Sequence, residues 1–285
     1  MNNTRKNRIW TVVIIVCAVI AAACIGVLIW MHVSQEQAEQ QMSGAVKPTH
    51  SATETIEQGH TKTTPEPSAE PEPDPEPEPQ PADVPIDFEY LKGINEDIYG
   101  WIVLTATDQE YPVVSNAKDP DYYLHRDVNR NYSPDGTLYT QSTANELEFI
   151  DPCTVIYGHN MNSGKMFGKL QRMARQRDID DAESEGNYFT LYTPTKIEKY
   201  RICAEGVFSN KSILYYYDFS DEESFAKFFK DFRNTSGPHY YCSDLEPQFG
   251  DEIVILSTCY SADHTYRFLT IGVMVEKEGT EPVKT

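Results

Sequence analysis

The sequence predicts a mainly β domain, a closed or nearly closed barrel or sandwich, that follows a membrane helix and a disordered spacer. Three observations lead to this prediction. Residues 9–31 contain no charged side chain, residues 46–85 hold ten of the chain's 18 prolines, and eight short apolar runs follow residue 86. With 40% apolar residues, the chain of 285 residues has ample material for one buried core.

The charge of the chain and the motifs that its sequence lacks argue against several classes of function. There are 24 Lys and Arg residues against 44 Asp and Glu, a formal net charge of −20, which argues against a nucleic-acid binder. The sequence contains no Gly-rich phosphate loop, no Ca²⁺-loop spacing and no C-x-x-C pair among its six cysteines. We therefore expect no metal and no cofactor.

The apolar segment 9–31 has 23 residues, and about 20 suffice to cross the hydrocarbon core of a bilayer. A cleaved signal peptide is the competing interpretation, but its apolar region would span only about 7–15 residues. The flanking side chains favour a single-pass anchor with residues 1–8 in the cytoplasm and the rest outside. These are the basic residues before the segment, the two interfacial tryptophans and the acids after it: Arg5, Lys6, Arg8, Trp10, Trp30, Glu36 and Glu39.

Residues 32–85 form a predicted extracellular juxtamembrane segment and Pro/Glu-rich linker. Alternating prolines and like charges favour an extended, disordered chain, because such a segment has little apolar surface to bury. At about 3.1 Å per residue, 40 residues could reach on the order of 100 Å. We therefore interpret the segment as a stalk that holds the outer domain off the membrane; an inert linker is the alternative.

Residues 86–277 form the predicted outer domain, followed by a tail at 278–285. The expected strands are residues 100–104, 111–114, 136–139, 154–157, 188–192, 200–208, 253–258 and 268–275. Helices are expected at 87–93, 166–175 and 221–233. The last begins with Ser220 as N-cap and Glu223 in a capping box, and four phenylalanines at helical spacing give it one aromatic face.

The residues with the clearest chemical potential lie at strand ends. Cys259 follows the apolar run 253–258, Arg267 opens the next strand, and His159 follows the run 155–157. A thiolate is a nucleophile, an imidazole can move its proton, and an arginine can hold a carbonyl or a developing oxyanion. The three residues therefore predict nucleophilic catalysis, with His264 as the rival candidate for the base.

The same motifs resemble those of the sortase family. The resemblance is carried by Leu256-Ser257-Thr258-Cys259 with Arg267 downstream, and by Tyr157-Gly158-His159-Asn160-Met161. The run from Gly158 to Leu170 is especially similar to class B sortases, and the similarity extends over about residues 87–276.

This resemblance implies an eight-stranded β-barrel with peripheral helices and a cysteine transpeptidase of the Gram-positive cell surface. Cys259 would attack a Thr carbonyl in a C-terminal sorting signal and form a thioester. His159 would act as general acid and base, and Arg267 would hold the carbonyl or oxyanion. The acceptor would be an amine of a peptidoglycan precursor or a pilin lysine. The substrate groove would be lined by Leu124, Tyr157, Asn160, Ser257 and Thr258.

Two alternatives from other classes remain open at this point. A secreted cell-wall cysteine hydrolase could use the same Cys–His pair with water as acceptor, and a non-catalytic surface-binding domain would leave Cys259 inert. The sequence does not say whether Cys153, Cys203 and Cys242 form a disulfide, because pairing depends on geometry.

Overall fold

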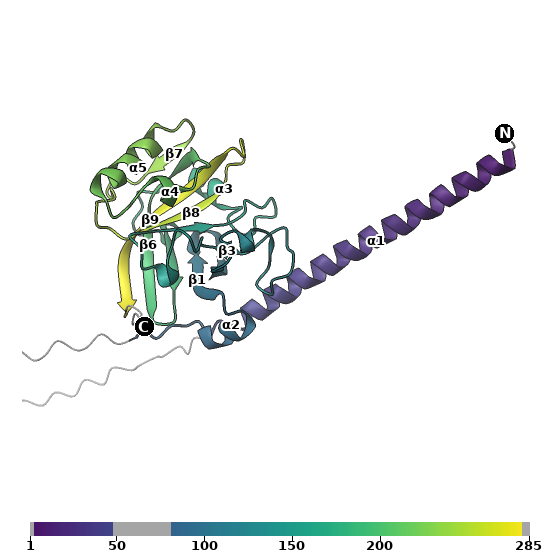
Figure 1. Cartoon of the computed structure of the whole chain (residues 1–285). Helices are drawn as coiled ribbons and strands as arrows, with labels where there is room; N and C mark the ends of the chain where they lie inside the picture. The colour runs from purple at the N-terminus through teal and green to yellow at the C-terminus, as the bar shows by residue number, and fades with distance from the viewer. Residues whose placement is uncertain (1–2, 48–80, 281–285) are drawn as a thin grey trace, which may run out of the picture.

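The computed structural model describes residues 3–47 and 81–280 (Figure 1). Most of the Pro/Glu-rich spacer and residues 281–285 of the tail lie outside the described residues, so the predicted disorder of the spacer stays a prediction. The described part consists of one long N-terminal helix that projects from a β-barrel with several short helices around it.

Eight strands close into a barrel, as the sequence predicts. Following the hydrogen-bonded neighbours around the ring gives β5–β1–β2–β3–β4–β8–β9–β6, and β6 pairs again with β5. The strands are β1 (Ile98–Leu104), β2 (Gln109–Val114), β3 (Leu138–Tyr139), β4 (Cys153–Tyr157), β5 (Tyr188–Tyr192), β6 (Lys196–Ser209), β8 (Ile253–Cys259) and β9 (Tyr266–Gly279). Closure satisfies the strand edges that an open sheet would expose.

One strand was not predicted. Strand β7 (His239–Tyr241) pairs with the second half of β6, beside the stretch of β6 that closes the ring with β5. It has only three residues and no apolar–polar alternation, so the sequence pattern does not reveal it.

The short helices follow local signals. Helix α2 (Phe88–Ile94) begins after Asp87, whose carboxylate accepts from the amide of Tyr90 at 2.9 Å. Helix α3 (Leu170–Gln176) starts four residues later than we expected, because Met166 has a left-handed φ of 52° that a helix does not accommodate. The remaining short segments are α4 (Ile213–Tyr216), η1 (Thr105–Thr107), η2 (Tyr122–His125), η3 (Leu147–Phe149) and η4 (Glu185–Asn187).

Helix α5 (Glu222–Asn234) confirms the predicted aromatic face but corrects its cap. The N-cap is Asp221, whose carboxylate accepts from the amide of Ser224 at 2.8 Å, so the expected capping box of Ser220 and Glu223 was wrong by one residue. The four phenylalanines of the helix are buried in one cluster with Phe208 of β6. The aromatic face is therefore a packing surface.

Strand β8 has apolar side chains on both faces, and this arrangement sets the direction of its last residues. Val254 and Leu256 belong to one core cluster, whereas Ile253 and Ile255 belong to the cluster that contains the α5 phenylalanines. Since side chains alternate along a strand, Cys259 lies on the α5 side of the sheet.

Helix α1 (Asn3–Ser43) is much longer than the predicted membrane segment. Its described part from Trp10 to Ser43 is long and apolar enough to cross a membrane, judged by length and composition. Most of its large apolar residues from Trp10 to Val33 are exposed, whereas Ala38 and Ala45, near and just after its end, are buried against the barrel. The helix thus has an exposed part and a packed part.

Candidate active site

The parallel pair of β4 and β8 brings the two sequence motifs to one end of the barrel. Tyr157 lies opposite Ser257 in this register, and the amide of Gly158 donates to the Ser257 carbonyl at 3.1 Å. His159 and Cys259 each follow this pair by two residues, so both lie at the same end of the barrel. Carboxyl ends of parallel strands meet at one edge, which is why residues 100 positions apart in the chain converge.

Gly158 is required for this path of the chain. A Cβ atom at this position would lie 2.4 Å from Leu138 Cδ2 and 2.7 Å from Phe167 Cδ2, far inside contact distance. The absence of a side chain therefore lets the segment carrying His159 pass close to the barrel wall.

Cys259 and Arg267 are in direct contact. They face each other in the antiparallel register of β8 and β9, and the Arg267 Nη1 donates to the Cys259 Sγ at 3.3 Å. Both side chains are half-buried, so the sulfur is held and also reachable. A guanidinium in this place can stabilise negative charge on the sulfur or on an oxygen bound next to it.

The His159 ring is oriented by two neighbours. Its Nε2 lies 2.7 Å from the carbonyl oxygen of Leu124, and a carbonyl only accepts, so Nε2 carries a proton. The ring also stacks on His125 with centroids 5.3 Å apart and an interplanar angle of 21°. The nitrogen left to exchange a proton is therefore Nδ1.

Two amide side chains hold the backbone of Cys259. The Asn160 Nδ2 and the Gln171 Nε2 donate to the Cys259 carbonyl at 3.0 and 2.8 Å. The Gln171 Oε1 also accepts from the amide of Ser261 at 3.1 Å, so both ends of this side chain fix the turn after Cys259. Sequence reasoning missed Gln171, because a single glutamine on a short helix carries no chemical signature.

This fold and this motif pair can be compared with known proteins. No family model matches the chain. Sortase B of Listeria monocytogenes is 29% identical over 171 residues, which cover 59% of this chain and 65% of that protein. Sortase B of Staphylococcus aureus is 26% identical over 193 residues, or 66% of this chain and 75% of that protein.

Solved structures agree with these relatives. The structure of Clostridium perfringens sortase B matches with a TM-score of 0.56 and 26% identity, over 66% of this chain and all of that one (100%). Sortase B from B. anthracis in complex with AAEK1 matches with a TM-score of 0.55 and 26% identity, over 69% of this chain and 88% of that one.

The chain is thus similar to class B sortases in both sequence and fold. The match spans slightly less than two thirds of the Listeria protein and the whole of the Clostridium perfringens chain. The sequence-based recognition of the family and of its barrel is thereby confirmed.

The other predicted groove residues of the protein differ in exposure. Leu124 is 37% exposed and Tyr157 is half-buried, stacked on Tyr139 with centroids 5.5 Å apart. Ser257 and Thr258 are 3% and 2% exposed, and the buried Thr258 hydroxyl oxygen has no hydrogen-bond partner among the described residues. Both residues are paired with β9, so these two positions form part of the barrel wall.

An acidic and aromatic network missed by sequence reasoning lies near Arg267. The Tyr139 hydroxyl donates to the Asp121 carboxylate at 3.2 Å, and burial next to this carboxylate raises the pKa of Tyr139. The Arg267 charge opposes the rise in pKa at Tyr139 and at Tyr157, so the guanidinium lies within electrostatic reach of both rings. The rival base, His264, is exposed in the turn between β8 and β9.

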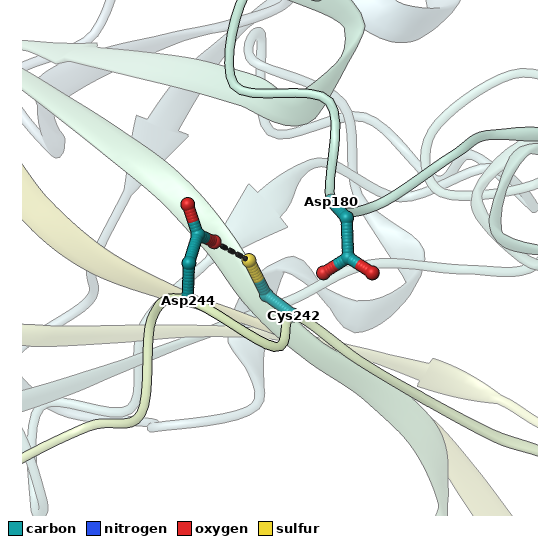
Figure 2. Close-up of side chains that lie close together, drawn as sticks. All are labelled: Asp180, Cys242 and Asp244. Atoms are coloured by element: carbon teal, nitrogen blue, oxygen red, sulfur yellow. Dashed lines mark hydrogen bonds between the residues drawn. The ribbon is translucent and has the colours of Figure 1, made fainter.

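Within the described residues, one group has the geometry of metal ligands: Asp180, Cys242 and Asp244, whose ligand atoms lie within 4.8 Å of one another (Figure 2). The Cys242 Sγ donates to Asp244 at 2.8 Å, and Arg201 pairs with the same carboxylate at 2.9 Å. Burial and the carboxylate raise the pKa of the Cys242 thiol. Arg201 already supplies a positive charge to Asp244 within this group.

The cysteines of the described residues are all free thiols, including Cys153, Cys203 and Cys242. The bridges left open by the sequence are therefore not formed in this structure.

Proposed function

We propose that this sortase is a membrane-anchored cysteine transpeptidase in which Cys259 is the nucleophile. The observation that carries the proposal is the 3.3 Å contact between Arg267 and the Cys259 sulfur, at the strand end where the β4–β8 register brings His159. The half-buried sulfur can meet a substrate, whereas Cys153 and Cys203 are buried. We assign His159 as general acid and base and Arg267 as the group that holds the carbonyl oxygen.

The proposed reaction has two acyl transfers. The Cys259 thiolate attacks the backbone carbonyl of a Thr in a C-terminal sorting signal, a thioester forms, and the peptide C–N bond breaks as His159 protonates the leaving amine. An acceptor amine then attacks the thioester and gives its proton to His159. A new amide bond forms and the Cys259 thiolate leaves, so the enzyme is regenerated.

For the acceptor we propose an amine of a peptidoglycan precursor or of a pilin lysine. One of the sortase B structures with a similar fold is described as complexed with triglycine, a peptide that carries a free amine, and another as a substrate complex. The groove side chains proposed for the sorting signal are Leu124, Tyr157 and Asn160, with Ser257 and Thr258 in the strand that leads to Cys259.

For the location, we propose that α1 crosses the cell membrane once, with its N-terminus in the cytoplasm and the barrel outside, facing the wall. The support is the apolar, exposed part of the helix between Trp10 and Val33, preceded by basic residues. The membrane lipid is thus a further partner of the chain.

The test is mass spectrometry of the full chain in nanodiscs, mixed with sorting-signal peptides with and without an added amine. A thioester on Cys259 that passes to the amine supports the proposal. Release to water alone, with no gain from the amine, would instead indicate a wall hydrolase. No adduct at all, with peptide binding unchanged in Cys259→Ala, would indicate a non-catalytic binding domain.

A further inference from the structure

The end of helix α1 lies on the barrel. Ala38 is 7% exposed and Ala45 is fully buried, and both belong to a core cluster with Trp101 of β1 and Leu91 of α2. By contrast, the apolar side chains nearer the N-terminus, such as Ile14 and Leu28, are about two-thirds exposed (65% and 63%). The same helix therefore has one part that stands clear of the described domain and one part built into it.

Polar contacts fix the packed part on several sides. The Gln35 Nε2 donates to the Ser133 hydroxyl at 3.1 Å, and Gln41 is bonded to Asn129 at 3.0 Å and to Tyr90 at 3.3 Å. These partners come from α2 and from the loop between β2 and β3. Contacts from separate elements restrain both the position and the rotation of the helix end.

One contact of the helix end reaches the loop that carries His159. Glu39 forms an ion pair with Lys165, which lies between His159 and helix α3. In the same loop Asn160 and Met166 form an isolated β-bridge. Lys165 therefore lies in a turn that is closed by this bridge. The helix end is thus joined to the domain near the catalytic face as well as at α2.

The two flanks of the spacer are joined to each other. Val46 and Ile86 form an antiparallel bridge, the Asp87 amide donates to the Ala45 carbonyl at 2.8 Å, and the Lys47 amide donates to the Pro85 carbonyl at 2.8 Å. The described residues on either side of positions 48–80 therefore meet at one place on the domain. The contour length of positions 48–80 does not separate α1 from the barrel.

We propose that residues 35–47, the α1 bracket, hold the barrel close to the membrane surface, and that the Pro/Glu-rich spacer does not act as a stalk. This inference rests on the proposed membrane crossing of α1. From residue 32 to residue 43 the helix rises only about 18 Å at roughly 1.5 Å per residue. An extended spacer would instead allow separations on the order of 100 Å.

The partner surface that this geometry defines is the bilayer itself. A rigid helix that ends in the domain gives the catalytic face one height and one orientation above the lipid, because no free linker intervenes between them.

The experiment compares one short Gly/Ser linker at two places in the full chain, in a supported bilayer, with the barrel height measured by neutron reflectometry. In the first variant the linker replaces residues 50–78; in the second it is inserted after Val33, ahead of the bracket. We expect the replacement to change the mean height by no more than about 10 Å, roughly one helix diameter, and the insertion to broaden the height distribution. The barrel and the bracket are intact in both variants.

A matched pair of substitutions tests the bracket directly. Ala38→Glu adds a charge to the buried contact between α1 and the barrel, and Gln37→Glu adds the same charge on the exposed side of the helix. We expect only Ala38→Glu to broaden the height distribution, with the melting temperature of the barrel as the control for folding.

The outcomes separate the two proposals. A chain that inserts in the bilayer, but whose barrel height falls by tens of ångströms when residues 50–78 are replaced, would overturn the bracket and leave the membrane anchor intact. An unchanged distribution of barrel heights after insertion of the linker behind Val33 would also contradict the bracket. A chain that does not insert at all would overturn both proposals.

Discussion

Two cysteines flank strand β9, and their surroundings differ in every respect that matters for reactivity. Cys203 lies inside β6, is 2% exposed, and its Sγ donates to the Ile271 carbonyl at 3.3 Å. Burial raises the pKa of the Cys203 thiol far above its ordinary value of 9.0. Cys259 ends β8, is half-buried, and its Sγ accepts a hydrogen bond from Arg267 at 3.3 Å.

The difference shows that position along a strand decides the role of a cysteine in this barrel. In the middle of a strand, neighbours on both sides exclude water and cations, so the thiol stays neutral and inert. At the end of a strand the ladder opens, and the facing residue of the next strand can place a charged group on the sulfur.

The largest expected effect separates these two cysteines. Cys259→Ala should lower transpeptidation by at least about 10⁴-fold, because the variant lacks the sulfur that forms the thioester. Cys203→Ala should retain more than half of the activity in the same peptide-transfer assay. Equal loss of activity in both variants, with folded barrels by circular dichroism, would contradict the assignment of the nucleophile.

His159→Ala should lower the transfer rate by about 10²–10⁴-fold, since the thiol loses the group that removes and returns its proton. His264→Ala is the matched control and should leave the rate nearly unchanged. The measurement is single-turnover formation of the acyl-enzyme by mass spectrometry. A large effect at position 264 with none at 159 would exchange the two roles.

Arg267→Lys should lower the rate by about 10²–10³-fold, because an ammonium group cannot reproduce the planar fork that reaches both the sulfur and a substrate oxygen. Thermal melting should change little, since the side chain lies at the barrel rim. Near-normal turnover in this variant would show that only the charge at position 267 matters.

Gln171→Leu tests whether the hydrogen bonds to the Cys259 backbone contribute to its reactivity. It removes one of the two amides that hold the Cys259 carbonyl, so we expect about a tenfold lower kcat with little change in KM. Gln171→Glu keeps the acceptor for the Ser261 amide but loses the donor, and should show a similar decrease. An effect on KM alone would place the residue in substrate binding instead.

The smallest effect concerns stability at high pH. Burial raises the pKa of the folded Cys203 thiol above the pKa of about 9 that it has in the unfolded chain. Above about pH 9 the unfolded state therefore loses the thiol proton while the folded state keeps it, and the free energy of unfolding falls as the pH rises. For Cys203 this loss approaches about 1.4 kcal/mol per pH unit.

Denaturant titrations between pH 8 and 10.5 test this behaviour. Unfolding free energy should fall less steeply with pH in Cys203→Ala than in the unaltered chain, although the variant starts about 1–2 kcal/mol lower because of the cavity. Parallel slopes would mean that the buried thiol does not set the alkaline limit.

The sequence by itself determined which segments become strands and where the reactive residues fall along them. All eight apolar runs became barrel strands, and the phenylalanines of α5 pack as their spacing predicts, because alternation and helical spacing are local properties. The placement of Cys259, Arg267 and His159 at strand ends was equally visible in the sequence.

Only the tertiary structure decided what those residues meet. The parallel register of β4 with β8, the Gln171 bond to the Cys259 carbonyl and the bridge between Val46 and Ile86 join segments about 40 to 100 residues apart. Such contacts depend on how the whole chain closes, and no local pattern records them. For the same reason the sequence suggested a stalk without revealing that Val46 and Ile86, on its two sides, pair beside the barrel.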